Sequence, residues 1–384
     1  MLGKTNITAL SEGGIVTEIE DYRWIQMQTG IYGNFVKAIY KGGYLVAITA
    51  DGTVAYTADG EVWNMATLEY KNCRLNDIDW DGSNFVLAGS YLNEDNNTSQ
   101  KTRLMLATAD FENFRRIGLK DQGECYAVMP QNGRYIVVAS DERDVVFAVF
   151  TGLDATTVDS KRLTSPTSSW LVHHCITAKN TAEMLAYIHI NYAYSGSNSH
   201  CIYKICDGLA DMVIPSENKL PDVKAMVPFE CKGSVYFMDL LQERNYNLNK
   251  VTDSDEILTM CTGQNFMFVD GVYFDECQVF INNHEMLIVR KGESIADKTL
   301  DDLIEIAPEF TMNCITKAFG QLYIFGNQGV ILKSSVETDN NEAIIVQTLS
   351  AKKALADAKA YTDVIYAELE ARIAAMEMMI DANS

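Results

Sequence analysis

The sequence has too little positive charge for a protein that binds nucleic acid. Its 384 residues contain 31 Lys plus Arg against 52 Asp plus Glu, which gives a formal net charge of −21 at pH 7. A field of this sign repels the phosphate backbones of nucleic acids and anionic lipid headgroups alike. We therefore expect neither nucleic acid nor a membrane surface among the partners.

Long hydrophobic runs are also absent. The longest dense apolar run, residues 145–150, is far shorter than the roughly 20 residues that span a bilayer. Residues 1–14 contain no continuous apolar segment of the kind that a secretory signal needs. We expect a chain made in the cytoplasm without a signal peptide and without membrane insertion. Apolar residues nevertheless make up 47% of the chain, enough for a large core.

The usual signatures of metal, nucleotide and hydrolase sites are missing. The nine cysteines include no CxxC pair of the kind that binds zinc, and we expect them to be small, reduced core residues. No GxGxxG, Walker or GxSxG motif occurs. His173 and His174 are adjacent, and adjacent residues of a strand point to opposite faces, so they cannot chelate one ion together.

One acidic cluster matches half of a calcium loop. Asp77, Asp79 and Asp81 alternate ahead of a glycine, as in the first half of an EF-hand, but the twelfth position is Ala88 instead of the required Glu. We interpret the cluster as one face of an inner strand. The sequence therefore predicts no catalytic residue, no cofactor and no metal.

What the sequence does contain is an internal repeat. A turn followed by a short β-branched or aromatic run recurs near positions 44, 85, 135, 185, 235, 279 and 322. The mean spacing is about 46 residues, within the roughly 40 to 50 of four-stranded propeller blades. The β-rich composition of each unit excludes helical repeats. We predict an all-β fold, a seven-bladed β-propeller over residues 21–349, preceded by an N-terminal arm over residues 1–20.

The strand order can be followed within a unit. In the first unit, residues 35–40 are the predicted inner strand and residues 44–49 the second strand. Asp51-Gly52 is predicted as a two-residue hairpin turn, followed by a third strand over residues 53–57. The last unit repeats this order, with its turn at residues 326–329.

The third strand of the first unit runs into a motif that resembles the Asp-box of sialidase-like and other propellers. A second copy with the same internal spacing keeps the Thr, the Asp and the terminal aromatic residue but lacks the Gly. An Asp at a hairpin tip accepts hydrogen bonds from the amides of its own turn, and the aromatic residue packs between blades. We interpret the motif as a structural element. Its residues are Thr57, Asp59, Gly60 and Trp63 in the first copy, and Thr108, Asp110 and Phe114 in the second.

The pattern changes after residue 349. Residues 350–384 are rich in Ala and Lys, contain no Gly or Pro, and predict a long C-terminal α-helix. Apolar and small residues follow a coiled-coil seam along it, which favours an oligomerising stalk, most simply a homotrimer. A helix folded back on the propeller is the alternative. The seam residues are Leu355, Ala358, Thr362, Ile365, Leu369, Ile373, Met376 and Ile380.

A propeller with degenerate Asp-boxes, followed by the Ala/Lys-rich start at residues 354–363, resembles tail-fibre or baseplate-associated proteins of bacteriophages and phage-tail-like particles. This resemblance implies a virion structural protein located in the tail. The helix would trimerise or dock to other tail or baseplate proteins. The propeller would present a surface to the host envelope, including host surface glycans, or to neighbouring tail proteins.

Two alternatives to the tail protein remain open at this point. A sialidase-like, glycan-active enzyme on the same ring needs three converging arginines. An Arg-Ile pair of the kind found in that family occurs at Arg116-Ile117, but it follows the second motif instead of lying near the first strand. We therefore expect no enzyme. An intracellular scaffold propeller is the other alternative, in which the C-terminal helix has a partner of another sequence.

Overall fold

The structure of the protein is a computed structural model that describes residues 6–10, 14–19, 22–27 and, with short gaps, 29–336. Between residues 141 and 228 it describes the backbone of the strands and no side chains. The chain divides into two compact units, one containing residues 3–26 with 334–384 and the other residues 27–333. The helix predicted over residues 350–384 and its seam residues lie outside the described residues.

The smaller unit contains three antiparallel strands at the start of the chain. They pair in sequence order, β1 with β2 and β2 with β3. Their bounds are β1 (Asn6–Leu10), β2 (Gly14–Ile19) and β3 (Tyr22–Gln26). The first two fall in the segment predicted as an N-terminal arm, whose role stays a prediction.

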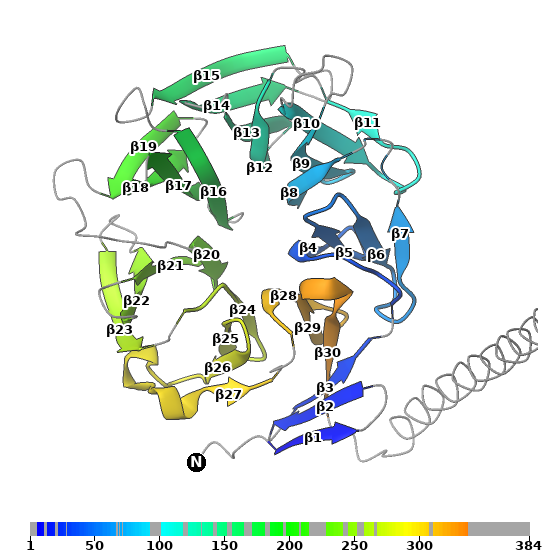
Figure 1. The fold of residues 1–384 in the computed structure, drawn as a ribbon, viewed down its shortest axis with the longest axis vertical. Coiled ribbons are helices and arrows are strands. Elements are labelled where there is room, and N and C mark those ends of the chain that lie inside the picture. Colours follow the sequence, from blue (N-terminus) through cyan, green and yellow to red (C-terminus); the bar gives the residue numbers. More distant parts are fainter. Residues whose placement is uncertain are drawn as a thin grey trace, which may run out of the picture. The chain divides into compact units, whose positions relative to one another are not determined.

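The larger unit consists of antiparallel sheets in which strands that follow each other along the chain lie side by side (Figure 1). We number these sheets 1 to 7 in chain order. Sheet 1 contains β4 (Phe35–Lys41), β5 (Tyr44–Thr49), β6 (Val54–Thr57) and β7 (Asn64–Ala66). Sheet 2 contains β8 (Arg74–Trp80), β9 (Phe85–Leu92), β10 (Lys101–Thr108) and β11 (Arg115–Arg116). Sheet 3 contains β12 (Glu124–Gln131), β13 (Arg134–Ser140), β14 (Asp144–Thr151) and β15 (Thr156–Thr164).

The remaining sheets repeat this meander. Sheet 4 contains β16 (Leu171–Asn180), β17 (Leu185–Tyr194), β18 (Ser197–Cys206) and β19 (Leu209–Ile214). Sheet 5 contains β20 (Pro228–Cys231), β21 (Ser234–Leu240), β22 (Asn245–Val251) and β23 (Ile257–Gln264). Sheet 6 contains β24 (Asp270–Phe274), β25 (Cys277–Ile281), β26 (Glu285–Val289) and β27 (Ile304–Glu305). Sheet 7 contains β28 (Met312–Ala318), β29 (Gln321–Gly326) and β30 (Ile331–Val336).

Contacts between first strands close these sheets into a ring. Each of β4, β8, β12, β16, β20 and β24 contacts the first strand of the next sheet, and β28 contacts β4. We call these first strands the inner strands, and Figure 1 shows them grouped around the centre of the unit. A cyclic arrangement of antiparallel meanders, four-stranded in sheets 1 to 6, is the architecture of a β-propeller. The prediction of an all-β propeller is therefore confirmed.

The second strands of the described sheets are the most deeply buried elements. Val46 and Ile48 of β5 and Phe85 and Leu87 of β9 are fully buried and pack together in one apolar cluster. Such strands are covered on both faces because each sheet stacks on the next, which explains why they appear in the sequence as continuous apolar runs. Every repeat anchor from the sequence lies in or one residue from a second strand.

The predicted turn of sheet 1 is one residue longer than expected. Thr49 N donates to Thr53 O (2.9 Å), so residues 50–52 form a three-residue loop instead of a two-residue hairpin. Gly52 adopts φ +90°, and Gly329 in the corresponding turn of sheet 7 adopts φ +75°. A glycine in the left-handed region is the usual way to end a three-residue hairpin loop.

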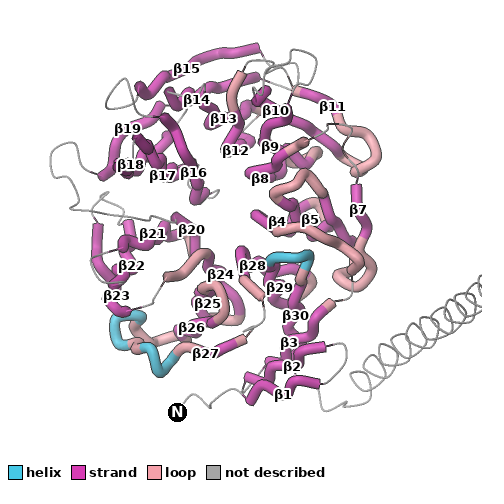
Figure 2. Tube along the Cα trace, viewed as in Figure 1, coloured by secondary structure: helices cyan, strands magenta, loops and turns pink. Residues whose placement is uncertain are grey.

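Short 3₁₀ helices connect successive strands in sheets 6 and 7 (Figure 2). They are η3 (Ile295–Asp297), η4 (Leu300–Asp302) and η5 (Asn327–Gly329). No helix within the described part of the chain has the length and apolar character needed to cross a bilayer. Cys73, Cys125, Cys231 and Cys314 are buried and form no disulfide. Burial raises the pKa of the Cys125 thiol to about 12, as expected for an inert core residue.

Candidate functional site

The acidic cluster on β8 is used to hold neighbouring sheets together. Asp77 is 1% exposed, and its Oδ1 lies 2.6 Å from Lys37 Nζ on β4. Its Oδ2 accepts a hydrogen bond from the backbone amide of Val128 on β12 (2.8 Å). One buried carboxylate therefore links the inner strands of sheets 1, 2 and 3, because it is neutralised on one side and hydrogen-bonded on the other.

The other two carboxylates of the cluster have separate partners. Asp79 is 8% exposed and accepts from the amide of Trp80. Asp81 lies in the following turn, where it accepts from Asn84 N and from Tyr135 Oη of sheet 3 (2.6 Å). Hydrogen bonds of this kind outweigh burial and lower the pKa of Asp81. The described residues contain no group of three or more His, Cys, Asp or Glu able to hold a metal ion.

A second carboxylate on the opposite part of the ring makes the same type of link. Asp270 of β24 accepts from the amide of Ile315 on β28 through Oδ2 (2.9 Å), as Asp77 accepts from β12. Burial raises the pKa of Asp270, the Ile315 and Gly271 amides and Lys37 lower it, and the Glu230 carboxylate raises it, with a net pKa of about 6. Sequence reasoning missed Asp270 and Lys37, although a charged residue inside an apolar inner strand was a visible signal.

The Glu124 carboxylate, at the start of β12, contacts three polar side chains of sheet 2. Its Oε2 lies 2.6 Å from Lys101 Nζ, and its Oε1 accepts from Asn76 Nδ2 (2.9 Å) and lies 3.6 Å from Arg74 Nε. The glutamate side chain is 7% exposed, whereas the two cations are 46% and 51% exposed. Asn76 also donates to Cys125 O (2.8 Å). These contacts again join sheets 2 and 3.

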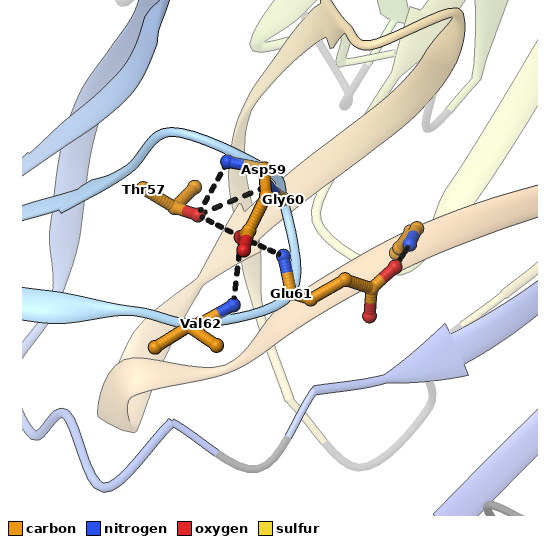
Figure 3. A network of polar contacts seen from close by, with 6 residues as sticks. Thr57, Asp59, Gly60, Glu61 and Val62 are labelled. Carbon is orange, nitrogen blue, oxygen red and sulfur yellow. Dashed lines mark hydrogen bonds and ion pairs between the residues drawn. The ribbon is translucent and has the colours of Figure 1, made fainter.

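The first predicted Asp-box is a hydrogen-bonded turn between β6 and β7 (Figure 3). Asp59 Oδ1 accepts from Glu61 N (2.8 Å), Val62 N (2.9 Å) and Thr57 Oγ1 (2.9 Å). Gly60 N donates to Thr57 Oγ1 (2.9 Å). The two turn amides are the main reason that the pKa of Asp59 is lowered. The turn satisfies its own backbone donors with two side chains.

This turn also contacts the preceding sheet. Glu61 forms an ion pair with Lys333 of β30, and the Trp63 ring meets Phe325 of β29 edge to face at 5.9 Å. A Cβ on Gly60 would lie too close to Tyr323 Oη. The motif therefore packs sheet 1 against sheet 7, where the ring closes.

The second predicted Asp-box has the same bonds without the glycine. Asp110 Oδ1 accepts from Glu112 N (3.0 Å) and Asn113 N (2.8 Å), and Phe111 N donates to Thr108 Oγ1 (2.9 Å). These amides and the Asn113 side chain lower the pKa of Asp110 to about 2. Assignment of both turns to the Asp-box class stays a prediction.

Phe111 takes the place of Gly60 in a left-handed conformation, with φ +59°. Its ring is 4% exposed and stacks on Tyr56 of β6 at 4.2 Å. Phe114, predicted to pack between blades, contacts the same apolar cluster. The strain of a positive φ at a non-glycine residue is offset by the aromatic contact between sheets 1 and 2.

The arginine considered for a sialidase-like site is engaged elsewhere. Arg116 lies over the rings of Tyr91 and Tyr70, 5.1 Å and 5.9 Å from their centres, and donates to Tyr91 Oη (3.0 Å) and Arg103 O (3.2 Å). It holds the outer part of sheet 2 together. The adjacent histidines 173 and 174 occupy a register shift in β16, and their side chains lie outside the described residues.

Comparisons with known proteins show the fold alone. No protein-family model matches the sequence, and no curated protein matches it either. The structure is similar to YCF48 bound to D1 peptide (TM-score 0.55, 13% identity, 86% of this chain and 100% of that chain covered). It is similar to virginiamycin B lyase from Staphylococcus aureus with quinupristin (0.55, 8%, 83% and 100%). It is also similar to the β-propeller domain of Cps50 (Swd1) from Myceliophteria thermophila (0.50, 12%, 87% and 100%).

Proposed function

We propose that the protein is a structural and binding component of a phage tail or phage-tail-like particle, in which a rigid ring presents a surface to the host envelope or to neighbouring tail proteins. The observation that supports this most is the use of the polar inner strands. Asp77 and Asp270 each accept a hydrogen bond from a backbone amide of the next sheet, and Lys37 forms an ion pair with Asp77. Charged side chains that hold neighbouring sheets together favour a rigid binding surface over a catalytic centre.

The finer architecture is part of this proposal. The seven sheets are the seven blades of one closed propeller, and residues 350–384 form the helix that joins three copies into a trimer. The Ala/Lys-rich segment at residues 354–363 supports the assignment to tail proteins through its resemblance to them. Proteins of similar fold include one solved with a bound peptide and one lyase, so the ring by itself does not specify the activity.

Imaging of particles tests the tail assignment. An antibody raised against the purified ring is added to particles released from the producing cells and detected by gold labelling under negative stain. We expect label on tails or tail-like particles. Label restricted to soluble protein, with bare particles, would contradict the proposal.

The mass in solution tests the trimer. The full chain is expected to have three times the mass of one 42.8 kDa copy. The chain ending at residue 349 is expected to have the mass of a single copy. A full chain that stays monomeric at every concentration would refute the oligomerising stalk and favour the scaffold alternative.

A further inference from the structure

The loop between β3 and β4 presents the most exposed aromatic side chain among those described in the ring. Tyr32 is 80% exposed, although its neighbour Ile31 is buried at 3%. Single exposed tyrosines are common on protein surfaces. An exposed aromatic residue indicates a binding site when its backbone is held in place, because binding then costs little conformational entropy. The contacts of this loop show whether its backbone is held.

Two hydrogen bonds and one close backbone approach hold the loop against the turn of sheet 7. Gly329 N donates to Gly33 O (2.6 Å), and Gln328 N donates to Asn34 Oδ1 (3.2 Å). Gly33 itself adopts φ +113°, which an L-residue rarely adopts. A Cβ on Gly329 would collide with Ile31 O, so the two backbones approach as closely as glycine allows. Tyr32 is thus displayed by a pre-organised backbone.

Two exposed polar residues lie on segments that contact the loop of Tyr32. Gln328 is exposed and adopts φ +57°, a left-handed conformation that is uncommon outside glycine and frequent at binding sites. The exposed Asp51 carboxylate lies against Gly33, where a Cβ would meet Asp51 Oδ2 at 2.8 Å. Asp51 accepts from Thr49 Oγ1 and, within the described residues, makes no ion pair. The backbone segments that carry the tyrosine, the amide and the carboxylate are thus neighbours, because Asp51 lies against Gly33 and Gly329 lies against Ile31 and Tyr32.

We propose that Tyr32, Asp51 and Gln328 form a docking platform for a Lys- or Arg-bearing segment of a partner protein. A cationic side chain binds the face of a tyrosine ring and pairs with a carboxylate, and the amide can accept one of its N–H groups. The net charge of −21 attracts such a partner over a long range. A neutral sugar also stacks on tyrosine, but it gains nothing from this charge. The inference rests on the proposed binding role of the ring and names the chemistry of its partner.

Binding of a labelled basic peptide tests the platform in the full chain. The probe is a fluorescein-labelled peptide of alternating Arg and Gly, measured by anisotropy at low and high salt. We expect Tyr32→Ala to weaken binding at least about tenfold, as for an aromatic hot spot, and Tyr32→Phe to bind like the natural chain because the ring face is kept. Asp51→Asn is expected to weaken binding and to reduce its salt dependence.

A matched control separates the platform from general attraction to an acidic protein. Met65 on β7 is 54% exposed and outside the platform, so Met65→Ala is expected to bind as the natural chain does. The proposal is overturned if the natural chain does not bind the peptide, or if Tyr32→Ala and Met65→Ala bind it equally. It is also overturned if only a labelled neutral glucose oligomer binds in a Tyr32-dependent way. None of these results affects antibody labelling of particles, which tests the tail assignment separately.

Discussion

Ring closure at the first turn motif provides a stability prediction with an internal check. Gly60 has φ +78°, and a Cβ at this position would collide with Tyr323 Oη and lie 2.9 Å from Phe319 Cδ2. Gly60→Ala therefore introduces two costs, an unfavourable backbone conformation and overpacking between sheets 1 and 7. Tyr323 is fully buried, and its hydroxyl has no hydrogen-bond partner among the described residues.

The two costs have different magnitudes and different remedies. The positive φ costs an alanine about 1 to 2 kcal/mol, and overpacking adds about 1 to 3 kcal/mol. Tyr323→Phe alone is expected to change the free energy of unfolding by less than about 0.5 kcal/mol, or to increase it, because it removes a buried hydroxyl that makes no bond. In the double variant the hydroxyl is gone, so part of the overpacking disappears and only the backbone cost stays in full.

Urea unfolding of the four proteins, followed by tryptophan fluorescence, gives the coupling energy. We expect the double variant to be about 1 to 2 kcal/mol more stable than the sum of the single changes. Gly43→Ala is the matched control, since Gly43 has φ +82° and nothing within 4 Å of the added Cβ. Its cost should be about 1 to 2 kcal/mol and independent of Tyr323. Additive effects of Gly60→Ala and Tyr323→Phe would refute the close approach of the two sheets.

Three further changes test the contacts between sheets. Asp270→Asn removes a carboxyl whose pKa is raised from the ordinary 3.8 to about 6. The natural chain should therefore lose about 1 to 3 kcal/mol of unfolding free energy as the pH rises from about 4 to 6, and the variant should not. Parallel curves for the two proteins in urea unfolding across this pH range would contradict the prediction. Phe111→Ala should lower the free energy of unfolding by about 3 to 5 kcal/mol, measured by thermal unfolding. Phe111→Gly should lower it by about 1 kcal/mol less, because Gly tolerates the positive φ of this position. Equal losses of stability in the two variants would contradict backbone strain at Phe111. Thr57→Val removes the acceptor of Gly60 N and should lower the free energy of unfolding by about 1 to 3 kcal/mol. Thr53→Val, at a neighbouring hairpin, should cost less because the Thr53 hydroxyl makes no hydrogen bond among the described residues. The reverse order would show that the turn does not depend on Thr57.

The sequence allowed the repeating backbone to be predicted because hydrophobic runs and turns recur with one spacing. The second strand of sheet 1 was predicted at residues 44–49 and is found as Tyr44–Thr49. The turn at Gly52 was predicted one residue too short, since loop length depends on which amide pairs across the hairpin, and Thr49 pairs with Thr53. Local pattern fixes where a strand lies more firmly than how its loop closes.

The contacts between sheets could not be predicted, because they join residues that are remote in the sequence. Asp77 was recognised as part of an acidic strand face, but Lys37 and Val128, its partners, lie in other repeats. Asp270 is a single charge in an apolar strand, and only the ring brings Ile315 to it. No short motif encodes such pairs, so a single sequence carries no signal of them.

Matching positions in successive sheets of the ring are occupied by different residues, and the contacts that stabilise the ring explain why. Each sheet is held by its own backbone hydrogen bonds and by an apolar second strand, so the contacts that join neighbouring sheets can use different residues in different repeats. Gly60 and Phe111 occupy the same place in two turns with φ +78° and +59°, yet one allows a neighbouring tyrosine to approach and the other fills that space with its own ring. Both solutions pack one sheet on the preceding one. A ring built this way keeps its shape while single loops change, which is the property that a surface for changing partners needs.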